Sequence, residues 1–246
     1  MTTQLILHRG GREVSRDELD AVPCPPPEGK WRPVPHGQVL RYAESALIAA
    51  GYEIRKMNLG LSRDNSKFFG VASLTTPIVP GVGLAVGLRS STDKSIALQF
   101  CFGDRVLCCD NLAFQSTTVV TRKHTTFGID RYQEAIGKAI SELQDFRAMQ
   151  SKRIEWMRET GMTDERAEAS LLRAFEQGIL GNRNLETAIK EWREPSFQEF
   201  RERKNVWRCF NSITSALRPR IKSNPQAHAS ATIRLGGLLC PPTELA

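Results

Sequence analysis

The spacing of hydrophobic residues predicts one helix followed by a series of strands. Apolar residues recur at helical spacing over residues 36–50, and Gly51 stands where a glycine typically ends a helix. Strand-like segments follow, with the turn residues Asp64 and Asn65 between the first two. These segments cover residues 52–62, 67–74, 82–89, 95–102 and 105–111.

Helical spacing returns in the second half of the chain. Helices are expected over residues 128–161, from Thr163 onward, over residues 184–194, and from Pro195 to about Leu217. Ser15 and Asp130 are expected to cap the helices that they precede or begin. This order predicts an α+β fold: an antiparallel β-meander of about five strands with helices packed on one side, followed by a helical carboxy-terminal region.

The chain is expected to consist of four parts. The proline-rich stretch at residues 23–33 is unsuited to a helix or a central strand, so residues 1–35 are expected to be an amino-terminal arm and linker. An α+β core domain is then expected at residues 36–150, a basic helical region at residues 151–222, and a carboxy-terminal tail at residues 223–246.

Composition places the chain among ordinary globular proteins. Of its 246 residues 40% are hydrophobic and 25% are charged, which is enough apolar material for a sizeable core. No apolar run reaches the length of about 20 residues that crosses a bilayer, and no basic leader precedes an apolar block. We therefore expect a cytoplasmic protein with no membrane partner.

The charge favours acidic partners, and nucleic acid is the commonest of these. The formal net charge is +7, and between Val120 and Arg234 there are 21 Lys or Arg against 15 Asp or Glu. The excess is sharpest in residues 201–222, where seven basic residues stand against the single acid Glu202. The residues that we expect to contact phosphates are Arg89, Lys94, Arg105, Arg122, Lys123, Arg203, Lys204 and Arg208.

Two groups of residues suggest catalysis, and each can also be explained by a structural role. Cys109 and His124 could form a nucleophile and its base, but Cys109 also continues a strand, where a buried thiol acts as a small hydrophobe. Asp93, Asp104 and Asp110 could gather at strand ends as a metal nuclease does, but Asp also initiates turns. The histidines are scattered and no CxxC pair occurs, so we expect no metal and no cofactor.

A polar loop and an aromatic stripe each allow two interpretations. The loop residues Ser90, Asp93 and Ser95, with Asp110 and Asn111 at the end of a later strand, are either turn residues or a site that holds a partner, and we expect the latter. The stripe is either core or a platform for base stacking, and core is expected. It consists of Phe197, Phe200, Trp207 and Phe210.

Five segments resemble the phage- and plasmid-like proteins grouped as domain of unknown function 932. They are VPHGQVL, FFGVASL, VGLRSSTDKSIALQFCFGDRVLCCDNLAF, RKHT and VWRCFNSITSAL, within residues 31–217. The resemblance implies a protein of mobile elements, whose small basic proteins handle DNA or counter host defence. The order of elements is also similar to that of ring-forming single-strand annealing proteins.

These observations lead us to expect a DNA-binding protein, homo-oligomeric, that binds single-stranded DNA and promotes strand annealing. Binding would be electrostatic, through counterions released from phosphates, and would need no catalytic residue. Two alternatives stay open. One is an interaction protein that inhibits a host defence system, and the other is a thiol- or metal-dependent enzyme.

Overall fold

A computed structural model describes residues 11–106, 112–113, 120–223 and 225–240. The chain divides into two compact units. The first contains residues 1–76, 84–103 and 116–146, and the second contains residues 77–83, 104–115 and 147–246. Long strands and one helix cross from one unit into the other, so neither unit is a continuous stretch of sequence.

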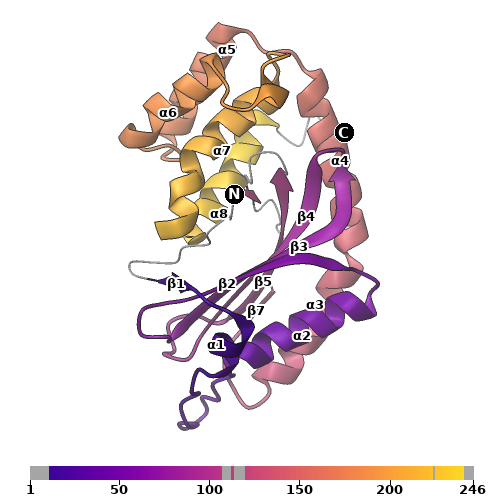
Figure 1. Cartoon of the computed structure of the whole chain (residues 1–246), viewed down its shortest axis with the longest axis vertical. Coiled ribbons are helices and arrows are strands. Elements are labelled where there is room, and N and C mark those ends of the chain that lie inside the picture. Colours follow the sequence, from indigo (N-terminus) through magenta and orange to yellow (C-terminus); the bar gives the residue numbers. More distant parts are fainter. Residues whose placement is uncertain (1–10, 107–111, 114–119, 224, 241–246) are drawn as a thin grey trace. The chain divides into compact units, whose positions relative to one another are not determined.

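The first unit is built on antiparallel strands in meander order (Figure 1). The strand order is β1-β2-β3-β4-β5, and β7 pairs with β5. β2 and β3 form a hairpin in which Leu61 lies opposite Phe68, with the turn at residues 62–66. The strands are β1 (Arg12–Glu13), β2 (Ile54–Leu61), β3 (Lys67–Val79), β4 (Val82–Ser91), β5 (Leu98–Val106) and β7 (Val120–Arg122).

Three helices complete the first unit. They are α1 (Arg16–Asp20), α2 (His36–Ala49) and α3 (Gly128–Ser141), and α2 and α3 contact each other (Figure 1). α2 buries Val39, Leu40, Ala43 and Leu47, one or two turns apart, so one apolar stripe enters the core. α2 ends just before Gly51, whose φ of +82° lies in the left-handed region that favours glycine.

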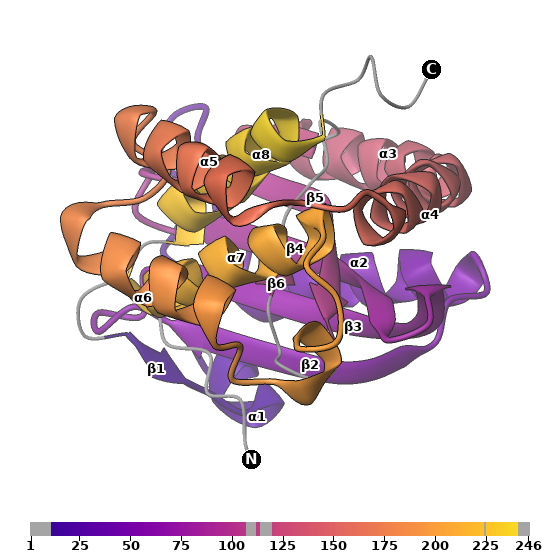
Figure 2. The same ribbon diagram turned by 90° about the horizontal axis from the view of Figure 1, so that it is seen from above.

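The second unit is mainly helical. Its core is the long helix α7, which contacts both α6 and α8 (Figure 2). Short strand β6 (Leu112–Ala113) pairs with Asp104 and Arg105 of β5. The helices are α4 (Leu143–Glu159, which begins in the first unit), α5 (Asp164–Glu176), α6 (Asn182–Arg193), the 3-10 turn η1 (Gln198–Phe200), α7 (Val206–Ser223) and α8 (Pro225–Leu239).

The expected α+β class is confirmed, with a meander sheet and a helical carboxy-terminal region. The sequence analysis placed several boundaries differently. The helix expected over residues 128–161 is broken at Glu142, and the helix expected from Pro195 begins at Val206. α8 occupies residues that were expected to be a tail.

The amino-terminal arm is part of the first unit. β1 pairs with β2, and α1 contacts α2, so residues 12–20 are packed and are not a free linker. Ser15 caps α1 with a capping box to Glu18, as expected. Asp130 does not cap α3, because Phe127 occupies the N-cap position.

The stripe of aromatic residues is mostly core. Phe200, Trp207 and Phe210 are each at most 5% exposed, and the last two rings stack with centroids 5.6 Å apart. None of the helices within the described ranges is long and apolar enough to cross a membrane.

Candidate functional site

Two of the cations expected to contact phosphates are buried. Arg208 is 5% exposed, and its guanidinium donates to the carbonyl oxygens of Trp192, at 2.8 and 2.5 Å, and Arg193, at 3.1 Å. Arg105 is 4% exposed, on the part of β5 that pairs with β6. A guanidinium that is buried in the fold is not presented to a phosphate at the surface. We therefore remove both residues from the expected set.

Three more of these cations are exposed, and each contacts another part of the chain. Lys94 pairs with the carboxylate of Glu28 and lies over the Trp31 ring, 4.9 Å from its centroid. Lys204 pairs with Asp164 at 2.7 Å. Arg203 donates to the carbonyl oxygen of a residue of α4, Glu159, at 3.2 Å.

Arg89 is half-buried, and burial lowers the pKa of its guanidinium. Of the expected cations in the polar loop and the late basic segment, only Arg203 is exposed and in no ion pair with a described acid, and it contacts α4 of the second unit. The other two expected residues lie in the first unit. Arg122 and Lys123 are exposed at the end of β7 and take part in no ion pair with any described residue.

Arg122 lines a groove between β7 and α3 in the first unit. The groove has a volume of about 470 Å³. Its other basic residues are Arg131 and Lys138, two turns apart on α3, and both are exposed. Its acids are Glu134 and Glu142, and apolar contact is supplied by Val120, Ala135 and Ala139.

The cations of the groove are not neutralised within the described part of the chain. No ion pair joins Arg122, Arg131 or Lys138 to a described acid, and among the described residues the Arg122 guanidinium donates to the carbonyl of Thr121, at 2.9 Å. With the neighbouring Lys123, four cations stand against two acids. An anion that enters the groove would therefore meet guanidinium and ammonium groups with unused donors.

Backbone pairing and helix packing fix both walls of the groove. On one wall, Val120, Thr121 and Arg122 lie opposite Phe100, Gln99 and Leu98 of β5. On the other wall, α3 buries the stripe Tyr132, Ile136, Ala139 and Ile140. The Tyr132 hydroxyl donates to the Gln99 carbonyl at 3.3 Å, which ties the helix to the strand that β7 also pairs with.

The turn between β7 and α3 requires a glycine at its end. A Cβ at Gly128 would lie 2.1 Å from the carbonyl oxygen of Lys123, a distance that no side chain tolerates. The Gly128 amide also donates to the Thr125 carbonyl at 2.8 Å. The tight turn therefore brings α3 back beside β7.

The amino-terminal segment runs beside the same turn. Trp31 forms an isolated β-bridge with Thr125, and the Arg32 amide donates to the His124 carbonyl at 3.0 Å. Arg32 is an exposed cation beside this turn, and its guanidinium donates to the carbonyl oxygens of Gly29 and Trp31, at 2.7 and 3.1 Å.

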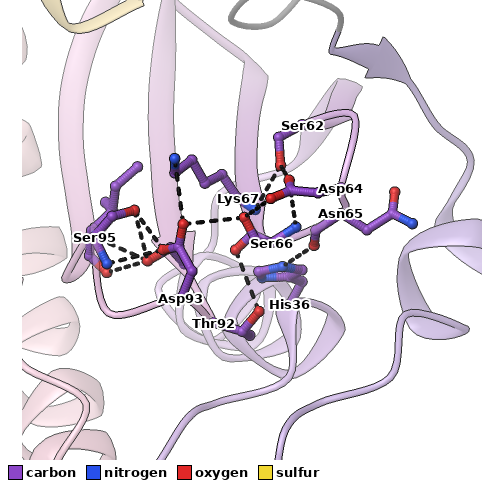
Figure 3. A network of polar contacts seen from close by, with 11 residues as sticks. His36, Ser62, Asp64, Asn65, Ser66, Lys67, Thr92, Asp93 and Ser95 are labelled. Carbon is purple, nitrogen blue, oxygen red and sulfur yellow. Dashed lines mark hydrogen bonds and ion pairs between the residues drawn. The ribbon is translucent and has the colours of Figure 1, made fainter.

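The polar loop is held together mainly by its own side chains. Asp93 accepts hydrogen bonds from the amide and hydroxyl of Ser95, at 2.9 and 2.5 Å, and from the hydroxyl of Ser66, at 3.2 Å (Figure 3). It also pairs with Lys67 at 3.3 Å. Burial alone would raise the pKa of the Asp93 carboxyl, but the hydrogen bonds from Ser95 and the contact with Lys67 outweigh burial and help to lower the pKa well below its usual range.

A second turn is joined to the first. Asp64 accepts hydrogen bonds from Ser62 and Ser66, and the Thr92 amide donates to the Ser66 carbonyl at 2.8 Å (Figure 3). Asn65 and Lys94 have φ values of +56° and +68°, in the left-handed region that is uncommon for residues other than glycine. The turn interpretation of Asp93 and Ser95 therefore accounts for their contacts without a ligand.

Two buried histidines contact one of these turns or the strand next to it. His36 is 1% exposed, and its Nε2 lies 3.0 Å from the Asn65 carbonyl, so this nitrogen donates. His124 is 5% exposed, and its Nε2 lies 3.4 Å from the hydroxyl of Ser90, which is itself fully buried. Burial, reinforced by the nearby His36, lowers the pKa of His124 to about 4.

The residues expected for catalysis do not form a site among the described residues. Cys109, Asp110 and Asn111 lie outside the described ranges. No carboxylate that the structure describes is hydrogen-bonded to His124, and none of the described His, Cys, Asp and Glu residues form a group of three or more that could hold a metal. Burial raises the pKa of the thiol of Cys101, a residue of β5, to about 12, which keeps that thiol protonated.

Arg131 and Lys138 were not among the residues expected from the sequence to contact phosphates. Their spacing of seven residues on a helix that had been recognised places them two turns apart on one face, beside the stripe that enters the core. This spacing could be seen in the sequence. The sequence does not reveal the pairing of β7 with β5, and only that pairing shows that this face lies opposite Arg122.

Comparison of the chain with protein-family models, with curated proteins and with solved structures finds no match in any of the three. The resemblance to phage- and plasmid-like proteins therefore stays a prediction from the sequence. The functional proposal rests on the geometry of the described residues.

The buried His124 predicts acid sensitivity. An unfolded histidine binds its proton near pH 6.5, whereas the folded one does so near pH 4, so the unfolded chain holds more protons between these values. The free energy of unfolding should therefore fall, by up to about 3 kcal/mol, as the pH drops through this window. Urea unfolding across this pH range measures the fall. His124→Gln should reduce it, and an equal fall in both proteins would exclude His124 as its source.

Proposed function

We propose that the chain binds single-stranded DNA through the groove between β7 and α3. The observation that carries the proposal is that the groove brings together three exposed cations, Arg122, Arg131 and Lys138, none of which is paired with a described acid. Lys123, which follows Arg122 in the chain, and Arg32, whose amide bonds to the His124 carbonyl, are further exposed cations near the groove. Phosphates that replace the counterions of these cations would supply the affinity.

The shape of the surface favours a single strand over a duplex. Proteins that read a duplex insert a projecting helix or ribbon into the major groove. Here the cations line a concave slot between a strand and a helix, which suits one sugar–phosphate backbone. Strand annealing and self-association stay predictions from the sequence.

Reversing the charge of one cation on each wall of the groove tests the proposal. Fluorescence anisotropy with a labelled oligothymidine of about 20 nucleotides, at about 50 mM salt, would measure the dissociation constant. The double variant Arg122→Glu, Arg131→Glu should bind about 10-fold more weakly or worse, because two attractive contacts become repulsive. Binding of the unaltered protein should also weaken as the salt rises to about 200 mM.

The matched control is Arg55→Glu, Lys56→Glu. These residues are exposed on β2, which is separated from β7 by three strands in the sheet order. The control changes the net charge by the same amount and should leave the affinity within about twofold. The proposal is wrong if the unaltered protein does not bind, or if the control loses as much affinity as the groove variant.

The two acids of the groove give a second test with the opposite sign. Glu134 and Glu142 line the same groove and would repel phosphates. We expect Glu134→Gln, Glu142→Gln to tighten DNA binding by about threefold, as measured in the same titration. Weaker binding in this variant would show that the acids contribute to recognition, as they would for a protein partner.

A further inference from the structure

Phe127 presents an aromatic ring to solvent beside the groove. Its exposed fraction is 63%, and no other aromatic side chain in the described part of the chain falls in the exposed class. It makes no ring contact with a described residue. A ring of this size usually contributes to a core or an interface, so its exposure calls for a physical reason.

The local structure around Phe127 does not explain why its ring is exposed. Phe127 occupies the N-cap of α3, with φ −101° and ψ 7°, and no side-chain hydrogen bond caps the helix. Ser, Thr, Asp and Asn are preferred at this position, because their side chains accept a hydrogen bond from a free amide of the first turn. Phe127 therefore neither caps the helix nor fills the core.

Phe127 lies four residues along the chain from each of two cations. Its carbonyl accepts a hydrogen bond from the Arg131 amide at 3.2 Å, so the two residues are one helical turn apart. Lys123 lies four residues before it, on the other side of the tight turn at Gly128. An aromatic ring next to exposed cations is the combination that binds single strands, in which phosphates meet charge and bases stack on rings.

We propose that Phe127 stacks on a base of the single strand whose phosphates lie along the β7–α3 groove. This inference rests on the proposed function and adds the residue that distinguishes a single strand from a duplex. Bases in a duplex are paired and stacked on one another, so their faces are not available to a side chain. The cations alone would not make this distinction, because phosphates are present in both forms.

The variant Phe127→Ser separates binding from folding. Serine is a good N-cap residue, so thermal unfolding should show an unchanged or higher melting temperature. Affinity for the oligothymidine should fall about 10-fold, which corresponds to about 1.4 kcal/mol. Affinity for an abasic oligonucleotide of the same length should not change, because that probe keeps the phosphates and lacks the bases. Ile48→Ser, at another exposed apolar residue of the first unit, is the matched control and should bind both probes normally.

Phe127→Trp supplies a direct signal of stacking. It should keep the affinity for the oligothymidine, and its added indole fluorescence should be quenched on binding, beyond any change in the unaltered protein. If the unaltered protein does not bind the oligothymidine, the proposed function fails and stacking fails with it. If it binds but Phe127→Ser binds equally well, or loses equal affinity for the abasic probe, stacking fails while the phosphate groove stands.

Discussion

The antiparallel pairing of β7 with β5 is the interaction on which the candidate surface depends. Three residues, Val120 to Arg122, are held against β5, and the bridge between Trp31 and Thr125 extends the pairing into the turn. Gly128 then lets the chain reverse, and Tyr132 fastens the helix to β5. Without this pairing, Arg122 would not face Arg131 and Lys138, and the groove would have only one wall.

The cost of burying charge explains why cations of the same chain have different roles. A guanidinium that leaves water needs acceptors for its donors, and Arg208 finds them in two backbone carbonyls. Lys94 and Lys204 stay at the surface and pair with acids. Arg122, Arg131 and Lys138 are also in water, are not paired with described acids and line one groove, so their charge is available together to a partner.

The polar loop has a structural role that bears on the same surface. Asp93 and Asp64 satisfy the hydroxyls and amides of two neighbouring turns, and Lys94 reaches from the first turn to Glu28 and Trp31. Because Trp31 bridges to Thr125, this contact connects the loop to the turn that precedes α3. Residues expected to hold a partner thus support the segment next to the groove.

The sequence predicts the fold better than it predicts which cations are exposed together, and the reason is physical. The meander and the cap at Ser15 follow from local patterns, since apolar spacing and capping chemistry act within a few residues. The break at Glu142 and the start of α7 at Val206 depend on packing that spacing does not reveal. The burial of Arg105 and the pairing that places Arg122 opposite Arg131 are long-range, so they could not be read from charge along the chain.

Hydrogen–deuterium exchange with and without a saturating oligothymidine tests the central claim most directly, because it locates the bound strand without altering the protein. The account predicts slower exchange of the backbone amides in peptides that cover residues 120–142, and little change in peptides from β2 and from residues 201–222. Unchanged exchange in residues 120–142, with slowing in residues 201–222, would contradict it and would assign DNA binding to the late basic segment.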